Sequence, residues 1–463
     1  MNPELQRNLW LEFTPRRLVL MALVLSVTLG VTALAASPQE RLENMASLGF
    51  GLYGLIVMLW GARNAANALA GEVRDRTWDM QRLSAIDPWS MTWGKLLGST
   101  AYTWFGGLLA LTPFIIVSLN EPHRHGPVFL ALCLALGAGA QALALLLCLA
   151  AARRRPQAGR FDVLIYALVA FGIASAVMQT VQALREGPAD SAATPTVVWM
   201  GAEHPLVAFC AASALVWAGV AVFGCWRLMR RELMMPHDVA GALIVLTIIA
   251  LYAMGFVQPE PDQSLVHYLA NACGVGAIAA GLFTAACTVA EPKDQVALRW
   301  IAAAWRRGAR GAALARAPGF TIGFTITLIL GLLAAGLSVL GPTQLTTGEN
   351  ATPVWPLILA ALGFLARDIM IFVFFHAAPR QRRGDFASLV LLALLYGAGA
   401  VLTSLAPLEG LRGLFVPTPE AAAASITPGG PPIMFLAPWL EAALVAYLAR
   451  ARLAAPGARP GPA

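Results

Sequence analysis

Three ionisable residues lie inside segments that are otherwise strongly apolar. Arg367 and Asp368 are adjacent in one such segment, and Glu441 lies in another near the C-terminal end. A charge in hydrocarbon costs about 2.5–3.5 kcal/mol even on the mildest scale, so a charged residue kept there is a candidate for function. The adjacent Arg367 and Asp368 can neutralise each other, whereas Glu441 has no evident partner near it in the sequence. We therefore consider these residues as candidates for a transport pathway, with a structural ion pair as the alternative.

A second group of charged and polar residues occupies a short run between two apolar segments. Its members are Glu72, Arg74, Asp75, Arg76, Thr77, Trp78 and Asp79. The run must lie outside the bilayer, because so many charges cannot stay in hydrocarbon unpaired. Val73, Thr77, Met80 and Ser84, with Leu83 beside them, fall on one stripe at helical spacing. This spacing predicts a surface helix over about 72–84 that buries the stripe and presents its charged face and Trp78 to a partner.

In order, this stretch reads Glu72-x-Arg74, Thr77, Leu83-Ser84, Ile86-Asp87-Pro88-Trp89 and Gly94-Lys95-Leu96-Leu97. The order resembles the cytosolic segment between the second and third spans of ABC-2-type transporter permeases, over residues 71–95. Arg76 and Ala85 depart from it, since the family usually has Gly and Pro there. The resemblance implies the membrane subunit of an ABC exporter, whose cytosolic segment docks on a separate ATPase subunit that binds ATP. The alternative is a solvated loop tied to a surface helix.

The composition predicts an all-α polytopic membrane protein. Of the 463 residues, 58% are hydrophobic and 12% are charged, and the mean hydropathy is +0.67. A soluble protein carries about twice that fraction of charge. The net charge of +7 does not indicate a nucleic-acid partner, because the basic residues lie in short loops between apolar runs. We therefore expect membrane lipids, and not nucleic acid, around this chain.

Apolar runs of transmembrane length recur along the whole sequence and predict about 12 spans. We place them at about 18–36, 46–68, 94–119, 127–151, 161–183, 205–226, 239–257, 266–288, 319–341, 353–377, 387–406 and 432–450. Residues 1–17 precede the first span as an interfacial helix. Asp87-Pro88 predicts an N-cap and a first-turn proline at the start of the third. We expect Met1–Ala36 to remain as an uncleaved anchor, although Ala33-Leu34-Ala35-Ala36 mimics a signal-peptidase site.

The distribution of basic residues predicts the orientation. With the N-terminus inside, the predicted external loops carry four of the 32 Lys and Arg residues, namely Arg41, Arg124, Arg185 and Arg412. The other 28 lie in the N-terminal segment, internal loops, C-terminal tail or nearby span residues. This bias fits the rule that cytoplasmic loops are enriched in basic residues. It predicts a multi-pass protein of the cytoplasmic (inner) membrane with both termini cytoplasmic.

Twelve spans divide into two six-helix halves, 1–230 and 231–463. The basic loops at 151–162 and 377–386 read alike, which favours two parallel halves that form an internal pseudo-dimer. Chance similarity between two loops in an Arg- and Ala-rich chain is the alternative. A homodimer is the other possible assembly. The longest internal loop of the second half, 289–318, predicts another amphipathic helix, with Trp300 and Trp305 near one face and Arg299, Arg306 and Arg307 around it. It could be a second docking helix or a basic helix on anionic lipid.

Known catalytic and nucleotide-binding motifs are missing from the sequence. Gly94-Lys95 lacks the other residues of a P-loop, so any ATP would be bound by the partner chain. We expect no enzyme activity, no bound cofactor and no metal site, since His123 and His125 have no third ligand in view. Two other classes stay open. One is a 12-helix secondary transporter of the major-facilitator type. Gly71-x-x-x-Asp75-Arg76 resembles the loop after the second span in that family. The other is a membrane-embedded enzyme.

Overall fold

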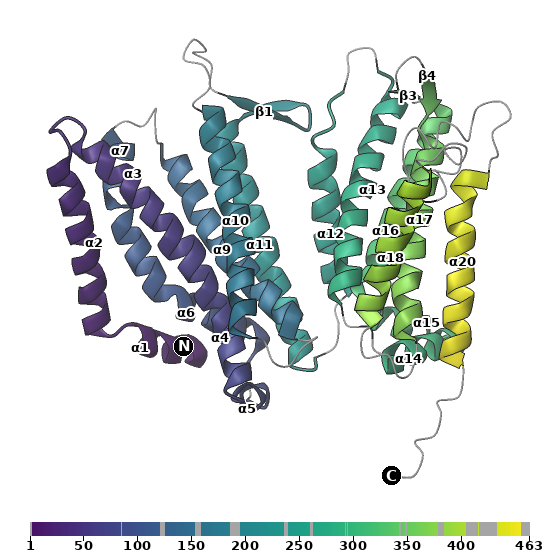
Figure 1. The fold of residues 1–463 in the computed structure, drawn as a ribbon, viewed down its shortest axis with the longest axis horizontal. Helices are drawn as coiled ribbons and strands as arrows, with labels where there is room; N and C mark the ends of the chain where they lie inside the picture. The colour runs from purple at the N-terminus through teal and green to yellow at the C-terminus, as the bar shows by residue number, and fades with distance from the viewer. Residues whose placement is uncertain are drawn as a thin grey trace. The chain divides into compact units, whose positions relative to one another are not determined.

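The computed structural model describes residues 2–84, 86–120, 126–152, 159–185, 195–235, 239–259, 263–291, 293, 295–341, 344–347, 350–377, 384–403, 415 and 433–454. Helices dominate these residues, and two short β-hairpins complete them (Figure 1). The chain divides into two compact units. Unit 1 holds Met1–Val197 and Glu203–His237, and unit 2 holds Val198–Ala202 and Asp238–Ala463. The predicted halves of six spans each stay a prediction.

Eight helices in the described ranges are long and apolar enough to cross a membrane. They are Pro15–Ala35, Arg41–Arg74, Pro127–Ala152, Phe161–Leu184, Leu206–Glu232, Leu265–Ala290, Gly319–Leu340 and Trp355–His376. A ninth is reached if Pro88–Ala110 and Thr112–Leu119, which meet at 47°, form one bent span. Apolar helices of this length satisfy their own backbone groups in hydrocarbon. The protein is therefore an all-α, multi-pass membrane protein, as its composition predicts, while the count of twelve stays a prediction.

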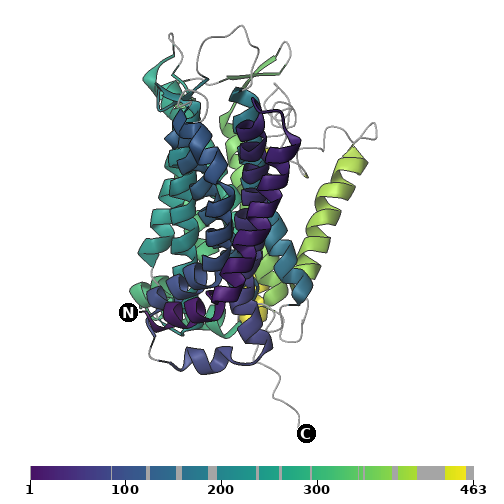
Figure 2. The same cartoon turned by 90° about the vertical axis from the view of Figure 1, so that its left-hand side faces the viewer.

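Unit 1 starts with a short helix that lies crosswise at one end of the longer helices (Figures 1 and 2). The bounds of its helices are α1 Pro3–Glu12, α2 Pro15–Ala35, α3 Arg41–Tyr53, α4 Ala62–Arg74, α5 Trp78–Arg82, α6 Pro88–Ala110, α7 Thr112–Asn120, α9 Pro127–Ala152, α10 Arg160–Arg185 and α11 Leu206–Glu232. The strands β1 Thr196–Trp199 and β2 Ala202–Pro205 pair between α10 and α11.

Proline and a capping side chain define two of these helix starts. Asn2 Oδ1 accepts hydrogen bonds from the backbone N–H groups of Glu4 and Leu5 at the start of α1. Asp87 Oδ2 does the same for Trp89 and Ser90 at the start of α6. A side-chain acceptor satisfies backbone N–H groups that have no partner within the first helical turn. Proline at the first position costs no helical hydrogen bond, because the N–H group that it lacks would have no partner there. The predicted N-cap at Asp87-Pro88 is confirmed.

A buried polar contact crosses the core of unit 1. Between α3 and α4 the chain passes through a π-helical stretch, η1 Gly54–Gly61, which widens the helix locally. The amide of Gln141 on α9 donates to the carbonyl of Val57 at 3.2 Å and accepts from Trp104 Nε1 at 2.8 Å. A Cβ at Gly61 would lie 2.4 Å from the amide nitrogen of Gln141. Gly61 therefore gives Gln141 room to satisfy a backbone group inside the unit.

Unit 2 is also mostly helical. Its helices are α12 Val239–Met254, α13 Leu265–Ala290, α14 Gln295–Arg306, α15 Arg310–Ala315, α16 Gly319–Leu340, α17 Trp355–His376, α18 Gly384–Thr403 and α20 Ile433–Ala454. The strands β3 Gln344–Thr347 and β4 Asn350–Pro353 pair antiparallel, with Gln344 opposite Pro353. Glu291 Oε2 accepts from the N–H groups of Gly319 and Phe320 at the start of α16. The short α14 and α15 lie at one end of the longer helices of this unit (Figure 1).

The predicted surface helix over about 72–84 is wrong as a single element. Instead, α4 ends at Arg74 and five residues from Trp78 form α5. Thr77 N–H donates to the carbonyl of Glu72, and Arg76 adopts a left-handed φ of 58°. This is the hydrogen-bonded turn in which glycine is the usual residue, because it pays no steric cost there. Arg76 occupies the position where the ABC-2 pattern has Gly. The left-handed backbone at this position favours glycine, which gives a physical reason for the residue in the pattern.

Candidate functional site

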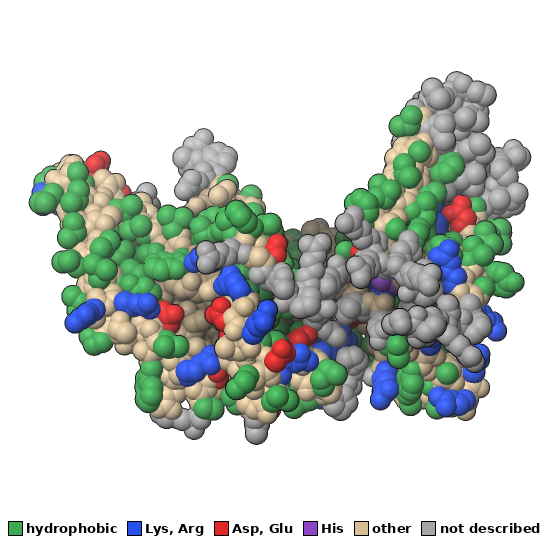
Figure 3. Space-filling model, turned by 60° about the horizontal axis from the view of Figure 1, so that its bottom comes forward, with side chains coloured by type: hydrophobic (Ala, Val, Ile, Leu, Met, Phe, Trp, Pro, Cys, Tyr) green, Lys and Arg blue, Asp and Glu red, His purple; other side chains and the backbone are tan. Residues whose placement is uncertain are grey.

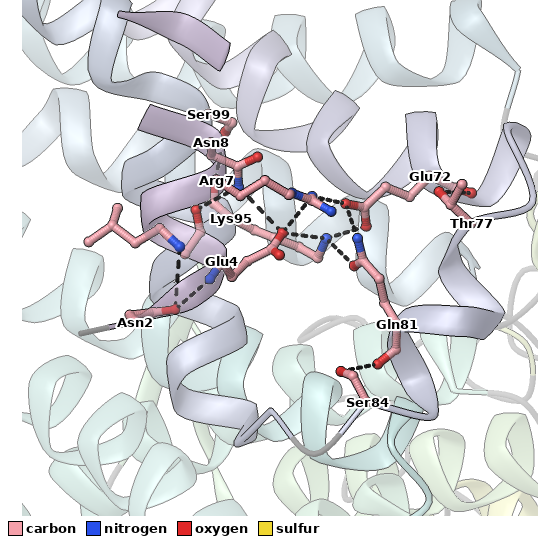
Figure 4. A network of polar contacts seen from close by, with 12 residues as sticks. Asn2, Glu4, Arg7, Asn8, Glu72, Thr77, Gln81, Ser84, Lys95 and Ser99 are labelled. Carbon is pink, nitrogen blue, oxygen red and sulfur yellow. Dashed lines mark hydrogen bonds and ion pairs between the residues drawn. The ribbon is translucent and has the colours of Figure 1, made fainter. Parts of the chain in front are cut away.

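A buried lysine ties the loop between α4 and α6 to the N-terminal helix (Figure 4). Lys95 lies in the second turn of α6, and its side chain has no exposed surface. Its ammonium group contacts Glu72 Oε2, Gln81 Oε1 at 3.0 Å and Glu4 Oε1 at 3.5 Å. The same group stands 5.2 Å from the centre of the Trp78 ring, within the range of a cation–π interaction. One ammonium group therefore joins α1, α4, α5 and α6.

A second cation balances the charge of this cluster. Arg7 Nη2 lies 2.8 Å from both Glu4 Oε1 and Glu72 Oε1, and its side chain is 47% exposed. Gln81 Nε2 donates to Glu72 Oε1 at 2.7 Å. We call Glu4, Arg7, Glu72, Gln81 and Lys95 the Lys95 cluster. Its two cations and two carboxylates sum to zero, so burial leaves no charge uncompensated.

Small residues on α6 allow α1 to approach closely enough to complete the Lys95 cluster. A Cβ at Gly94 would lie 2.6 Å from Glu4 Cγ, and one at Gly98 would lie 2.6 Å from Asn8 Cβ. Asn8 Nδ2 donates to the carbonyl of Gly94 at 3.1 Å. Asn2 Nδ2 donates to the carbonyl of Ser90 at 2.5 Å. Two helices that are distant in sequence are therefore held in contact by glycine spacing and side-chain amides.

Most of the predicted contact residues lie on the outside of this loop. Arg74, Asp75, Arg76, Thr77 and Asp79 are exposed. Arg74 Nη2 donates to Asn67 Oδ1 at 3.2 Å, and Asp79 lies 3.5 Å from Arg82 Nη1. Arg82 Nε also donates to the carbonyl of Glu232 at the end of α11. Charged side chains gather at this end of the unit, among hydrophobic ones (Figure 3).

Two parts of the predicted loop surface are inverted in the structure. Trp78, predicted to face a partner, is buried against Lys95. Met80 and Leu83, predicted to be buried, are 76% and 90% exposed. The physical reason is the turn at Asp75–Thr77, because α4 ends before it and α5 starts after it, so that residues 72–84 do not share the face of a single helix. The apolar groups that a partner could bury are therefore Met80 and Leu83.

A second cluster lies within the helices of unit 2 and joins all three of the predicted pathway residues. Arg367 on α17 is 2% exposed, and its Nε donates to Asp368 Oδ1 at 3.1 Å. Its Nη1 donates to Glu441 Oε2 on α20 at 3.2 Å. The hydroxyl of Tyr396 on α18 donates to Asp368 Oδ2 at 2.7 Å. We call Arg367, Asp368, Tyr396 and Glu441 the Arg367 cluster.

Two aromatic rings complete the surroundings of the guanidinium. The ring centres of Phe364 and Tyr396 lie 4.7 and 5.0 Å from Arg367 Cζ. An aromatic face attracts a cation more strongly where water is absent. The pairing of Arg367 with Asp368 agrees with the sequence expectation. The contact of Glu441 with Arg367 and the hydrogen bond of Tyr396 to Asp368 were not predicted. The sequence indicates these two residues only as polar side chains in the middle of predicted apolar helices.

The predicted second surface helix forms as α14. Ala304 on it is buried, Trp305 and Arg306 are exposed, and the guanidinium of Arg316 lies 4.1 Å from the Trp300 ring centre. Before α14, Lys293 Nζ lies 3.5 Å from Asp385 Oδ1. His123, His125 and most of the two basic loops at 151–162 and 377–386 lie outside the described residues.

No protein-family model matches the chain, and no curated protein or solved structure matches it either.

Proposed function

We propose that this chain is the transmembrane permease subunit of an ABC transporter, and that a separate ATPase subunit docks on the loop between α4 and α6. One observation carries this proposal. The loop exposes Met80 and Leu83 beside Asp79, while buried Lys95 fixes its base. Exposed apolar side chains rimmed by charges are typical of a surface that binds another protein. The order of residues from Glu72 to Leu97, which resembles the ABC-2 segment, supports the same assignment.

The Lys95 cluster would couple that surface to the membrane helices. A displacement of α5 would reach α4 through Glu72 and α6 through Lys95. It would reach α1 through Glu4 and Arg7. A charged network that is fully paired moves as one unit, because separating its members would leave buried charges unpaired. ATP would be bound and hydrolysed by the partner, and the direction would be export, as in most of the family that the loop resembles.

Twelve spans with both termini in the cytoplasm are part of this proposal. Besides the nine spans counted above, the described helices α12, α18 and α20 occupy the remaining predicted positions. The 28 basic residues on the predicted inner side support a cytoplasmic N-terminus. The loop between α4 and α6 would then face the cytoplasm, where ATP is available, and the membrane would be the cytoplasmic one. Two six-helix halves, as an internal pseudo-dimer or in a homodimer, are also part of this proposal.

The test is copurification of ATP hydrolysis after mild solubilisation of native membranes. Replacing Met80 and Leu83 together by Asp should weaken the affinity for the ATPase subunit at least ~30-fold, so that less ATPase activity copurifies. This is the loss expected when two buried interface side chains that contribute about 1 kcal/mol or more each are removed. Arg450→Glu, an exposed charge on α20, is the matched control and should retain the partner. Glu72 is unsuitable for this test, because its replacement would also break the Lys95 cluster.

A second candidate is a secondary transporter, and the Arg367 cluster is the observation that favours it. Charged groups within membrane helices are common in transporters driven by ion gradients. A secondary transporter would copurify with no ATPase in the wild type. That result, together with an unchanged Met80/Leu83 double variant, would replace the permease proposal by this one.

A further inference from the structure

The Arg367 cluster carries more negative than positive charge. It contains one guanidinium and two carboxyl groups. The guanidinium is always charged in proteins. If both carboxyl groups were ionised, the cluster would hold one uncompensated negative charge. The next cations along α20 are Arg450 and Arg452, nine and eleven residues after Glu441. Arg450 is exposed, and Arg452 donates to the carbonyl of Phe374 and lies over its ring.

This cluster lies deep in a membrane-crossing helix. Arg367 is roughly 18 Å from Trp355 and roughly 14 Å from His376 along α17, at about 1.5 Å per residue. α20 runs alongside α17 in the same direction, since Trp439 Nε1 donates to the carbonyl of Leu359 and Arg452 reaches Phe374. Glu441 therefore lies beside the middle of α17. Water is scarce at this depth, so an unpaired carboxylate there would be strongly disfavoured.

The exposed side of Glu441 faces the same way as leucine side chains. Its side chain is 43% exposed, and Leu444 and Leu448, one and two turns further along α20, are also exposed. Exposed leucines on a helix that packs along a transmembrane helix face lipid tails. The exposed part of the Glu441 side chain therefore lies on the same face of α20 as these leucines.

The two carboxyl groups differ in how well their oxygens are satisfied. Asp368 accepts from Arg367 Nε on one oxygen and from the Tyr396 hydroxyl on the other. Glu441 accepts from Arg367 Nη1 on Oε2. Hydrogen bonds donated to a carboxylate stabilise its ionised form. Asp368 is thus the better counter-ion for Arg367, and Glu441 is the group that can hold a proton.

We propose that Glu441 binds a proton within the membrane and makes the Arg367 cluster electrically neutral. This protonation site is independent of whether an ATPase docks on the loop of unit 1. The groups that face it are Arg367 and Asp368 from α17 and Tyr396 from α18. Of the other helices beside α17, α16 has no titratable side chain, and α13 carries His267 and Tyr268 in its first turn and Cys273 and Cys287 further along. None of these would add a positive charge at the middle of the helix.

The test uses dicyclohexylcarbodiimide, a lipid-soluble reagent that adds to a protonated carboxyl group in an apolar environment to form a stable N-acylurea. The full-length protein is reconstituted in lipid vesicles, treated at several pH values, digested and mapped by mass spectrometry. We expect adduct on Glu441 at pH 7, where a water-exposed Glu with a pKa of about 4.3 is ionised. The labelled fraction should fall as the pH of the treatment is raised, because the reagent needs a protonated carboxyl group. Exposed Asp79 is the internal control and should stay unlabelled at pH 7.

A charge variant sharpens this test. Leu444→Lys places a cation one turn from Glu441, where i and i+3 side chains meet. It should hold Glu441 ionised and lower its labelling at pH 7 by about tenfold or more. Unchanged labelling of this variant, wild-type Glu441 unlabelled at pH 6, or adduct on Asp368 in its place would each overturn the proposal. If Leu444→Lys fails to elute as a single species, the wild-type map decides alone.

Discussion

The Lys95 cluster and the Arg367 cluster contain the same basic arrangement in different surroundings. Each has one buried cation that contacts two carboxyl groups, Glu4 and Glu72 in unit 1 and Asp368 and Glu441 in unit 2. The first cluster also has Arg7, which contacts both of its carboxylates. Among the described residues around the second cluster, no such second cation contacts the two carboxyl groups. The first is therefore neutral with all groups ionised, whereas the second is neutral after it binds a proton.

The location of each cluster explains how its charge is neutralised. The Lys95 cluster lies at the end of the helices, and half-exposed Arg7 can reach it with its charged head in water. The Arg367 cluster lies near the middle of α17, where another cation would itself be costly. A proton adds the missing positive charge there without adding a second buried side chain. The comparison can be tested by changing the number of cations in each cluster.

The largest effect is expected for Lys95→Met. This change gives the first cluster one cation, Arg7, for two carboxylates. It removes the ammonium group that contacts Glu72 Oε2 and buried Glu4 Oε1. Removing one partner of a buried ion pair typically costs about 3–5 kcal/mol. We expect that loss in the free energy of unfolding, measured by denaturant titration in mixed micelles with tryptophan fluorescence.

Arg16→Met is a matched control for Lys95→Met, because it removes an exposed cation from α2 in the same unit. It should change the free energy of unfolding by less than about 0.5 kcal/mol. Equal effects of the two substitutions would show that Lys95 has no special structural role.

A smaller effect is expected for Arg367→Met. Here both carboxyl groups can take up a proton, and the substitution also removes a charge that hydrocarbon disfavours. Tyr396 keeps its hydrogen bond to Asp368. We expect a loss of about 1–2 kcal/mol, the scale of a lost hydrogen-bonded contact, in the same titration. A loss as large as that of Lys95→Met would show that Asp368 and Glu441 stay ionised, contrary to the comparison.

Some of these features could be predicted from local sequence alone. The cap at Asp87-Pro88, eight of the apolar spans and the Arg367–Asp368 pair depend on neighbouring residues, and the described part of the chain contains them. Glu441 lies 74 residues from Arg367, and the contact of α1 with α6 connects residues more than 80 apart. Such contacts depend on which helices pack together, which hydrophobic spacing does not determine. The inversion of Trp78 and Met80 has a local cause, the left-handed turn at Arg76, but no glycine marks it.

The smallest effect is expected for Arg7→Gln, which removes the second cation from the Lys95 cluster and leaves the buried one. Its charge count then equals that of the Arg367 cluster, yet water can reach the vacated position, because the Arg7 side chain is 47% exposed. Exposed ion pairs contribute about 0.2–1 kcal/mol, and we expect a loss in that range that shrinks further at high salt. Arg7→Lys, which keeps the charge, is the control. If Arg7→Gln instead costs as much as Lys95→Met at both ionic strengths, then water does not compensate the missing charge, and location alone does not explain why the two clusters are neutralised differently.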